Sequence, residues 1–229
     1  TSLLLEWGVT DAVVCPGSRN AAIVHNLNEC GTIRCHPITD ERSAAFYAMG
    51  IALNTKRPTV VCVTSGSALL NTAPAVAEAY YQHVPLIVIA ADRPQQWIDQ
   101  LDGQTLPQPD ALNRFVRRSV SLPEPRTEEE RWYCNRLVNE ALHAATFRQP
   151  APVLINVPIT EPLFTFDVAE LPKERRFRML DSEAALTNTT VEVLQQELYQ
   201  AKRPLIVVGQ MAADSFGRSV FDINELSKH

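Results

Sequence analysis

Short, unbroken apolar runs recur along this sequence and restrict its fold more than any other feature. They are rich in β-branched residues and cover residues 11–15 (DAVVC), 59–63 (TVVCV), 85–90 (PLIVIA), 153–157 (VLINV) and 204–208 (PLIVV). Strands that are apolar on both sides are typical of parallel sheets covered on both faces. Stretches of helical character separate the runs, most clearly residues 67–81 and 128–147. The alternation predicts an α/β fold, a parallel sheet with helices on both faces, built of right-handed βαβ units.

Composition and charge exclude several classes of function. The 229 residues are 45% hydrophobic and 21% charged, as in an ordinary globular protein, and the net charge of -5 argues against nucleic acid as a partner. No apolar run approaches the roughly 20 residues that cross a bilayer, so we expect no membrane partner. The N-terminus lacks the basic start and cleavage site of a signal peptide, which predicts a cytoplasmic location. The five cysteines show no C-x-x-C pair, and buried free thiols are favoured over redox or metal roles.

The periodic pattern is lost between residue 160 and about residue 187, where the segment PKERRFR reads as exposed. We therefore expect a first domain over residues 1–165, a linker over 166–188 and the beginning of a second, central α/β domain over 189–229. A helix from about residue 190 to 201 and the run at 204–208 would open that domain. About 40 residues cannot bury an independent core, so we expect the protein to continue beyond His229 or to have been cut there.

A further strand is expected over residues 33–38 (IRCHPI). Polar groups gather in four turns that follow predicted strands: 16–19 (PGSR), 40–42 (DER), 64–67 (TSGS) and 92–94 (DRP). Ligands of parallel α/β sheets bind beyond the carboxyl ends of the strands. Ser18 and Arg19 could place a hydroxyl and a guanidinium at one helix start, a pair suited to a carboxylate. The alternative is a plain Ser cap beside a solvent-exposed Arg. Arg93 could bind a carboxylate in the same way, or could form a surface ion pair with Asp92.

Glu41 opens the stretch ERSAAFYAMGIAL, in which small residues recur and predict a closely packed helix. A carboxylate at such a position could be functional. The alternative is that acidic residues favour the first turn of any helix because they complement its dipole.

The order of the motifs distinguishes these alternatives better than any single turn does. PGSRN, TDERSAAFYAMGIAL, PTVVCVTSGSALLN and PLIVIAADRP follow one another between residues 16 and 94. This series resembles the pyrimidine-binding domain of thiamine-diphosphate enzymes, in which a strand, a turn and a Glu-initiated helix precede a V-x-x-T-S-G turn. The forms PGSR, DERSAAF, TSGSA and ADRP are most similar to family members of menaquinone biosynthesis, whereas acetolactate synthases typically carry PGG. The resemblance runs from about residue 3 to 162.

The resemblance implies that thiamine diphosphate is the cofactor and that Glu41 is the catalytic carboxylate. In the family this Glu shares a proton with N1′ of the aminopyrimidine and so activates the thiazolium. Residues around the pyrimidine would be Glu41 with Pro16, Gly17, Thr64 and Ser65.

The implied substrates are 2-oxoglutarate, which would lose carbon dioxide, and isochorismate, which would accept the resulting succinyl unit in a transferase (carboligase) reaction. Ser18, Arg19 and Arg93 would bind their carboxylates. Gln104 matches a substrate-facing glutamine of the family, although Gly103 stands where the family usually has Asn.

The family also carries a C-terminal domain whose G-D-G and downstream Asn bind the diphosphate and Mg²⁺ (or Mn²⁺). This sequence contains no G-D-G, so we expect no metal ligand in it and no activity from this chain alone. Because the family's cofactor lies between domains of two subunits, a homodimer or tetramer is implied. Two alternatives stay open: another thiamine-diphosphate enzyme of the acetolactate synthase or decarboxylase type, and a non-catalytic α/β binding module.

Overall fold

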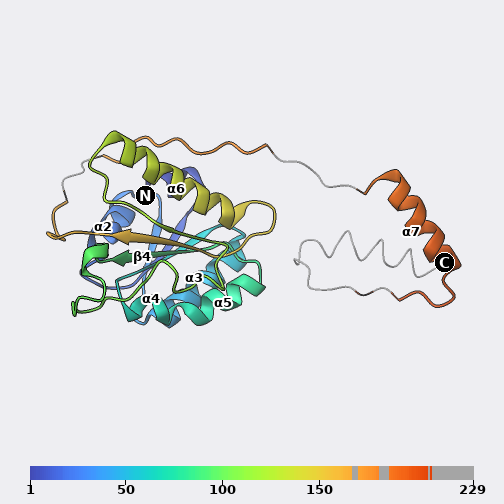
Figure 1. The fold of residues 1–229 in the computed structure, drawn as a ribbon, viewed down its shortest axis with the longest axis horizontal. Helices are drawn as coiled ribbons and strands as arrows, with labels where there is room; N and C mark the ends of the chain where they lie inside the picture. Colours follow the sequence, from blue (N-terminus) through green and yellow to red (C-terminus); the bar gives the residue numbers. More distant parts are fainter. Residues whose placement is uncertain (167–169, 181–185, 206, 208–229) are drawn as a thin grey trace. The chain divides into compact units, whose positions relative to one another are not determined.

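The computed structural model describes residues 1–166, 170–180, 186–205 and 207. The chain divides into two compact units, Thr1–Arg178 and Met179–His229. The first unit is a parallel sheet with helices on both faces (Figure 1). The fold class predicted from the apolar runs is therefore confirmed.

The sheet of the first unit has six strands in the order β2-β1-β3-β4-β6-β5, and every neighbouring pair is parallel. The strands are β1 (Asp11–Val14), β2 (Arg34–Pro37), β3 (Thr59–Val63), β4 (Leu86–Asp92), β5 (Arg118–Ser121) and β6 (Val153–Pro158). The apolar runs predicted β1, β3, β4 and β6, and the strand expected over residues 33–38 corresponds to β2. The polar edge strand β5 was not predicted.

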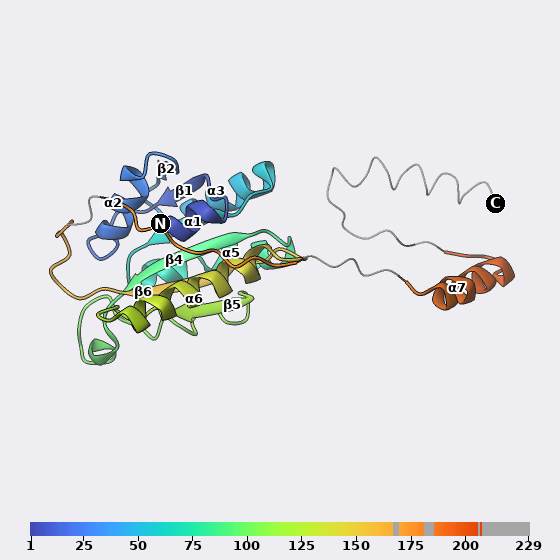
Figure 2. The same ribbon diagram turned by 90° about the horizontal axis from the view of Figure 1, so that it is seen from above.

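Two layers of helices cover the sheet, as the two views show (Figures 1 and 2). The core on one face contains residues of α3 (Glu41–Thr55), α4 (Ser67–Asn71) and α5 (Ala73–Tyr81). The core on the other face contains residues of α1 (Ser2–Glu6), α2 (Ala21–Glu29) and α6 (Glu128–Thr146). Along β3, Val61 and Val63 belong to the first core and Val60 and Cys62 to the second. This double burial explains why the strands are apolar without alternation.

Side chains mark where the helices begin and end. Asp40 caps α3 by accepting a 2.8 Å hydrogen bond from the backbone N–H of Ser43. Thr127 and Glu130 form a reciprocal capping box at the start of α6. The single helix predicted over residues 67–81 is divided at Thr72. Pro74 explains the division, because its ring lacks an N–H and clashes with a helical carbonyl four residues earlier.

The carboxyl ends of all six strands meet at one edge of the sheet, because all the strands are parallel. The segments that leave this edge include the four polar turns predicted from the sequence and a long connection from β4 to β5, which contains the short 3₁₀ helix η1 (Gln95–Trp97). The candidate site is built from these segments.

Part of the predicted linker lies within the first unit, which extends to Arg178. The side chain of Asn139 in α6 donates a 3.0 Å hydrogen bond to the carbonyl of Arg175 and accepts one of 3.0 Å from the N–H of Phe177. The guanidinium of Arg176 lies 4.3 Å from the ring centroid of Trp7. Nη1 of Arg176 also donates a 2.9 Å hydrogen bond to the carbonyl of Glu6, the last residue of α1. Residues 175–177 are therefore fixed by α6 and by the end of α1, and the domain limits expected from the sequence stay a prediction.

In the second unit, the structure describes the helix α7 (Asn188–Gln200), which Thr187 caps through the N–H of Thr190. The predicted strand at residues 204–208 lies partly outside the described residues. Among the described residues, no helix has the length and apolar character needed to span a membrane.

Candidate functional site

Glu41 is the first residue of α3 and is half-buried. Its Oε2 accepts a 3.1 Å hydrogen bond from Nδ2 of Asn71, the last residue of α4. Within the described part of the chain, its Oε1 has no hydrogen bond. Burial, with a smaller contribution from the Glu41 charge, raises the pKa of the Cys15 thiol to about 12, so Glu41 lies close to the end of β1. The carboxylate is thus oriented by one amide and keeps one oxygen available.

The first and third polar turns touch through Gly17 and Thr64. A Cβ on Gly17 would lie 2.5 Å from Cβ of Thr64 and 2.6 Å from Oδ1 of Asn20. Only glycine allows this approach. Thr64 and Ser65 are buried, whereas Pro16, Gly17 and Ser18 are exposed.

The start of α2 contradicts the alternative considered for Ser18, which was a helix cap. Asn20, not Ser18, is the residue that precedes the helix, and it makes no side-chain cap. Its amide donates instead to the carbonyl of Cys15 at 2.9 Å. Ser18 is therefore not a helix cap, and its hydroxyl lies in an exposed turn.

Gln104 lies over the third turn. Gly66 has a φ of 80°, and a Cβ there would be 3.0 Å from the backbone of Gln104. The N–H of Gly66 donates a 2.7 Å hydrogen bond to Oε1 of Gln108 in the same loop. The loop that carries Gln104 is therefore held against the Thr64–Ser67 turn, with Gly103 exposed beside it.

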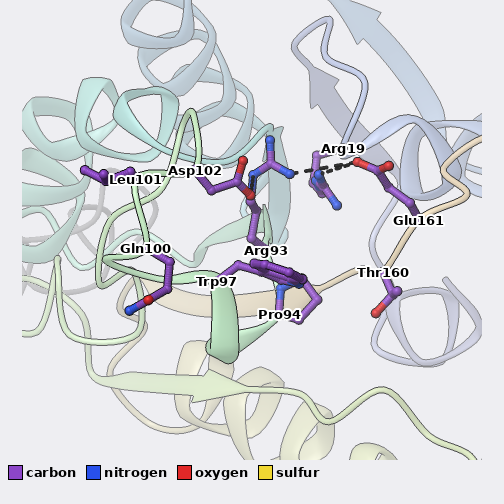
Figure 3. A pocket seen from close by; sticks show the side chains of 9 residues that line it. All are labelled: Arg19, Arg93, Pro94, Trp97, Gln100, Leu101, Asp102, Thr160 and Glu161. Carbon is purple, nitrogen blue, oxygen red and sulfur yellow. Dashed lines mark hydrogen bonds and ion pairs between the residues drawn. The ribbon is translucent and has the colours of Figure 1, made fainter.

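Arg19 and Arg93 converge on one carboxylate oxygen, that of Glu161 (Figure 3). Nη2 of Arg19 lies 3.2 Å from Oε1 of Glu161, and Nη1 of Arg93 lies 3.9 Å from the same atom. Nη1 of Arg19 also donates a 2.7 Å hydrogen bond to the carbonyl of Ile159. The Arg19 side chain is only 6% exposed, so the solvent-exposed alternative for this residue is wrong.

Arg93 pairs with Asp102 rather than with Asp92. Its Nε lies 3.0 Å from Oδ2 of Asp102 and donates a 3.0 Å hydrogen bond to the carbonyl of Gly103. Asp92 is buried, and its Oδ1 accepts a hydrogen bond from the backbone N–H of Arg93 at 2.8 Å. Burial raises the pKa of Asp92, although hydrogen bonds from Asn156 and the Arg93 backbone and the charge of Arg19 oppose this. Arg93 thus forms its ion pairs with Asp102 and Glu161, not with Asp92 as considered from the sequence. Asp92 is instead a buried carboxylate that accepts a backbone hydrogen bond at the end of β4.

The two arginines line a pocket of about 560 Å³ (Figure 3). Its walls are formed by Arg19, Arg93, Pro94, Trp97, Gln100, Leu101, Asp102, Thr160 and Glu161. Two guanidiniums that already share a carboxylate oxygen form a site that can bind the carboxylate of a small molecule. Glu41 is not part of this lining; it belongs to the neighbouring side of the carboxyl edge, with Asn71.

Sequence reasoning missed four polar residues of this edge: Asn71, Gln108, Asn156 and Glu161. One of them had a detectable signal, because Asn156 interrupts the apolar run VLINV and a buried amide must find hydrogen-bond partners. Gln108 stands between two prolines in an irregular loop and had none. In the described ranges, no group of three or more His, Cys, Asp or Glu side chains could hold a metal ion.

Comparisons with known proteins show which family model and which curated proteins this chain is similar to. Residues 1–113 match the family model described as thiamine pyrophosphate enzyme, N-terminal TPP binding domain. A protein of Bacteroides thetaiotaomicron named 2-succinyl-5-enolpyruvyl-6-hydroxy-3-cyclohexene-1-carboxylate synthase is 53% identical over 213 residues, which are 92% of this chain and 38% of that protein. A protein of the same name from Phocaeicola vulgatus is 50% identical over 210 residues, with the same coverage of 92% and 38%.

The chain thus spans about 38% of the length of these curated relatives. The solved structures include a similar fold in benzoylformate decarboxylase from Polynucleobacter necessarius. The TM-score is 0.69 at 19% identity, over 89% of this chain and 36% of that one. At this identity the likeness concerns the fold alone.

Proposed function

The chain belongs to the thiamine pyrophosphate (thiamine diphosphate) enzyme family, and on that premise we propose that it is the N-terminal part of a 2-succinyl-5-enolpyruvyl-6-hydroxy-3-cyclohexene-1-carboxylate synthase. The full-length protein would decarboxylate 2-oxoglutarate and transfer the succinyl unit to isochorismate in menaquinone biosynthesis. The observation that carries the proposal is the identity of 53% over 92% of the chain to a relative of that name. The paired arginines of the pocket supply an independent chemical reason.

The residues around Glu41 fit the aminopyrimidine of thiamine diphosphate. Asn71 orients one carboxylate oxygen and leaves the other available, as a group that shares a proton with a ring nitrogen requires. Gly17 provides close backbone approach beside Thr64, where any larger residue would clash. In the proposal, Pro16, Gly17, Thr64 and Ser65 form the surroundings of the ring, and Glu41 contacts it.

Bound thiamine diphosphate supplies the nucleophilic carbon and the electron sink for decarboxylation of a 2-oxo acid. The role proposed for Glu41 is to hold a proton at its free carboxylate oxygen and to share it with N1′ of the pyrimidine. Asn71 would keep this carboxylate in one orientation by its hydrogen bond. The apolar small-residue face of α3, buried against the sheet, would fix the position of the first helical turn.

The proposed substrate side is the arginine pocket. Both 2-oxoglutarate and isochorismate carry two carboxylates, and Arg19 and Arg93 approach a carboxylate oxygen together. A substrate carboxylate would take the position that Glu161 has here. Ser18, in the exposed turn before Arg19, and Gln104, over the third turn, are proposed to contribute hydrogen bonds to the same substrates.

The diphosphate and its Mg²⁺ or Mn²⁺ would be bound by a part of the full-length protein outside this chain, so we propose that this chain alone is inactive. The proposed limits are a pyrimidine-binding domain over residues 1–165, a linker over 166–188 and the start of the central domain over 189–229. A cytoplasmic homodimer or tetramer is proposed as well. Exposed apolar side chains on α3 to α5, namely Phe46, Tyr47, Leu53, Leu70 and Tyr81, support self-association.

The test uses the full-length protein with thiamine diphosphate and Mg²⁺. Isochorismate with 2-oxoglutarate is expected to yield the succinyl adduct and one carbon dioxide, identified by mass spectrometry. Pyruvate is the matched control donor. Consumption of pyruvate without consumption of 2-oxoglutarate would instead support an enzyme of the acetolactate synthase type, and binding without any turnover would support the non-catalytic alternative.

A further inference from the structure

A buried glutamine connects the third and fourth polar turns. Gln108 is 0% exposed although it lies in an irregular loop. Its Oε1 accepts a 2.7 Å hydrogen bond from the N–H of Gly66, and its Nε2 donates to Oδ1 of Asn156 at 2.8 Å and to the carbonyl of Ala91 at 3.1 Å. Both donor hydrogens and the acceptor of this one amide are thus engaged with three different strand ends.

The hydrogen bonds continue from Asn156 to both arginines. Asn156 is 1% exposed, and its Nδ2 donates to Oδ2 of Asp92 at 2.8 Å. Asp92 in turn accepts the backbone N–H of Arg93 at 2.8 Å through Oδ1, and the N–H of Ile159 at 3.0 Å through its carbonyl. The carbonyl of Ile159 is the group that receives the guanidinium of Arg19. The network therefore runs from Gly66 to the backbone of Arg93 and to the side chain of Arg19.

From Gly66 to Asp92, every hydrogen bond of the network is donated in the same direction. The N–H of Gly66 can only donate and an ionised Asp92 can only accept, so each amide between them must present its oxygen towards Gly66 and its nitrogen towards Asp92. Rotation of the Gln108 amide by half a turn would place two donors face to face at Gly66 and two acceptors face to face at Asn156. A buried polar network in which every group is satisfied favours one arrangement of the elements that it joins.

We propose that Gln108 is a positioning residue for the reaction, an inference that rests on the carboxylate-binding role proposed for Arg19 and Arg93. Gln108 is fully buried and does not line the arginine pocket. It acts through Gly66 on the turn beside the cofactor and through Asn156 and Asp92 on the arginines. The amide thereby fixes the distance between the cofactor side and the substrate side of the carboxyl edge.

Two variants of the full-length enzyme test this role, Gln108→Met and Gln108→Glu. Methionine has nearly the same shape and no strong hydrogen bond, so we expect the KM for 2-oxoglutarate and isochorismate to rise and kcat/KM to fall by about 10²-fold, the cost of a misplacement near 1 Å. The affinity for thiamine diphosphate is expected to change less than about threefold, since an interaction made elsewhere is independent of this site. Gln96→Met and Gln96→Glu are matched controls, because Gln96 is exposed in η1 of the same loop.

The Gln108→Glu variant adds a pH readout that a merely structural role would not give. Its ionised carboxylate would face the oxygens of Asn156 and Ala91 as an acceptor, whereas the protonated carboxyl would regain one donor. Burial raises the pKa of such a carboxyl. The activity of Gln108→Glu relative to the unsubstituted enzyme is therefore expected to recover as the pH falls from about 8 to about 6, and that of Gln108→Met is expected to stay low at every pH.

Amide hydrogen exchange in the full-length protein separates this inference from the proposed function. In Gln108→Met, peptides that contain Gly66 and peptides that contain Arg93 are both expected to exchange faster, and neither is expected to change in Gln96→Met. Faster exchange at Gly66 with unchanged exchange at Arg93 would overturn the coupling, as would unchanged KM values with slower turnover only. If the unsubstituted enzyme ignored 2-oxoglutarate and isochorismate, the proposed function would fail, while the exchange result would still decide whether Gln108 couples the two turns.

Discussion

Nδ2 of Asn71 donates a 3.1 Å hydrogen bond to Oε2 of Glu41, and this contact joins the end of α4 to the start of α3. A helix dipole would attract a first-turn carboxylate without fixing its orientation. The hydrogen bond from Asn71, on a second helix, does fix the orientation of the Glu41 carboxylate. It engages Oε2 and leaves Oε1 without a hydrogen bond to the described residues. The contact therefore separates Glu41 from acidic residues that only complement a helix end.

Glu41→Gln in the full-length enzyme is expected to lower kcat by about 10² to 10⁴-fold, the usual contribution of a group that transfers a proton. Glu128→Gln is the matched control, because Glu128 is the first residue of α6 and is exposed. Both substitutions remove a first-turn charge and should change stability by less than about 1 kcal/mol. Steady-state kinetics and thermal unfolding are the measurements. Equal, near-normal turnover of the two variants would return Glu41 to a helix-start role.

Arg19→Lys in the full-length enzyme tests the carboxylate pocket. Lysine keeps the charge but cannot use a planar fork to reach Ile159 and Glu161 at once. We expect KM for 2-oxoglutarate or isochorismate to rise by roughly 10- to 100-fold, the equivalent of one charge-assisted hydrogen bond. Arg114→Lys, at an exposed position, should leave KM unchanged. Unchanged KM in both variants would remove Arg19 from substrate binding.

Substitutions of two glycines by alanine are expected to have effects of opposite sign. Gly17→Ala would force a Cβ to within 2.5 Å of Thr64, which should destabilise the fold by about 1–3 kcal/mol. Gly50 lies within α3 and a Cβ there would meet nothing within 4 Å, so Gly50→Ala should stabilise by about 0.5–1 kcal/mol. Urea unfolding of the two variants measures the difference. A stabilising Gly17→Ala would show that the first and third turns do not touch in solution.

The sequence was sufficient where structure depends on local burial. Val60 to Val63 could be assigned to a strand because the run is apolar on both sides. Each side of this strand is buried in one of the two cores. The start of α3 at Glu41 was visible for a similar reason, since the small residues that follow it pack against the sheet. In both cases, the residues that indicate the structure lie within a few positions of one another in the sequence.

Features that depend on distant partners were not visible. The strand β5 (RSVS) is polar apart from the buried Val120, and it is a strand because its backbone pairs with β6, about 35 residues later. Gln108 becomes buried because Gly66 and Asn156, 42 and 48 residues away, supply its partners. The convergence of Arg19 with Glu161 spans 142 residues. The motif order could place the arginines at one sheet edge but could not show which carboxylate they share.

Acid stability is expected to depend on Asp11. Burial alone would raise the pKa of this carboxyl, but hydrogen bonds from His36 and Thr10 and the charge of Arg34 hold the pKa below its ordinary value. A carboxyl with a lowered pKa stabilises the folded state above its unfolded value of about 3.9, and this contribution is lost as the pH falls through the folded pKa. The difference in unfolding free energy between the parent chain and Asp11→Asn should therefore shrink below about pH 4.

Urea unfolding at several pH values measures this difference. Asp99→Asn is the control for a carboxylate on the surface, since Asp99 is exposed. Its effect on the unfolding free energy should not shrink at acidic pH. A constant difference for Asp11→Asn would contradict the stabilising role of the His36 contact.

Asn139 is expected to hold residues 175–177 against α6. It is fully buried, its Oδ1 accepts from Nε1 of Trp7 and from the N–H of Phe177, both at 3.0 Å, and its Nδ2 donates to the carbonyl of Arg175 at 3.0 Å. Asn139→Leu preserves the volume but leaves the indole N–H of Trp7 and the N–H of Phe177 without partners, at a cost of about 1–3 kcal/mol for each one that stays buried. The carbonyl of Arg175 would keep only the 3.4 Å hydrogen bond from Nδ2 of Asn135. Release of the segment into water avoids the cost at Phe177. Limited trypsin digestion should therefore cleave the variant faster than the parent chain within PKERRFR, and Asn113→Leu, at an exposed position, should be cleaved at the parental rate. Equal cleavage of all three proteins would mean that the segment is already free in solution, as an exposed linker would be.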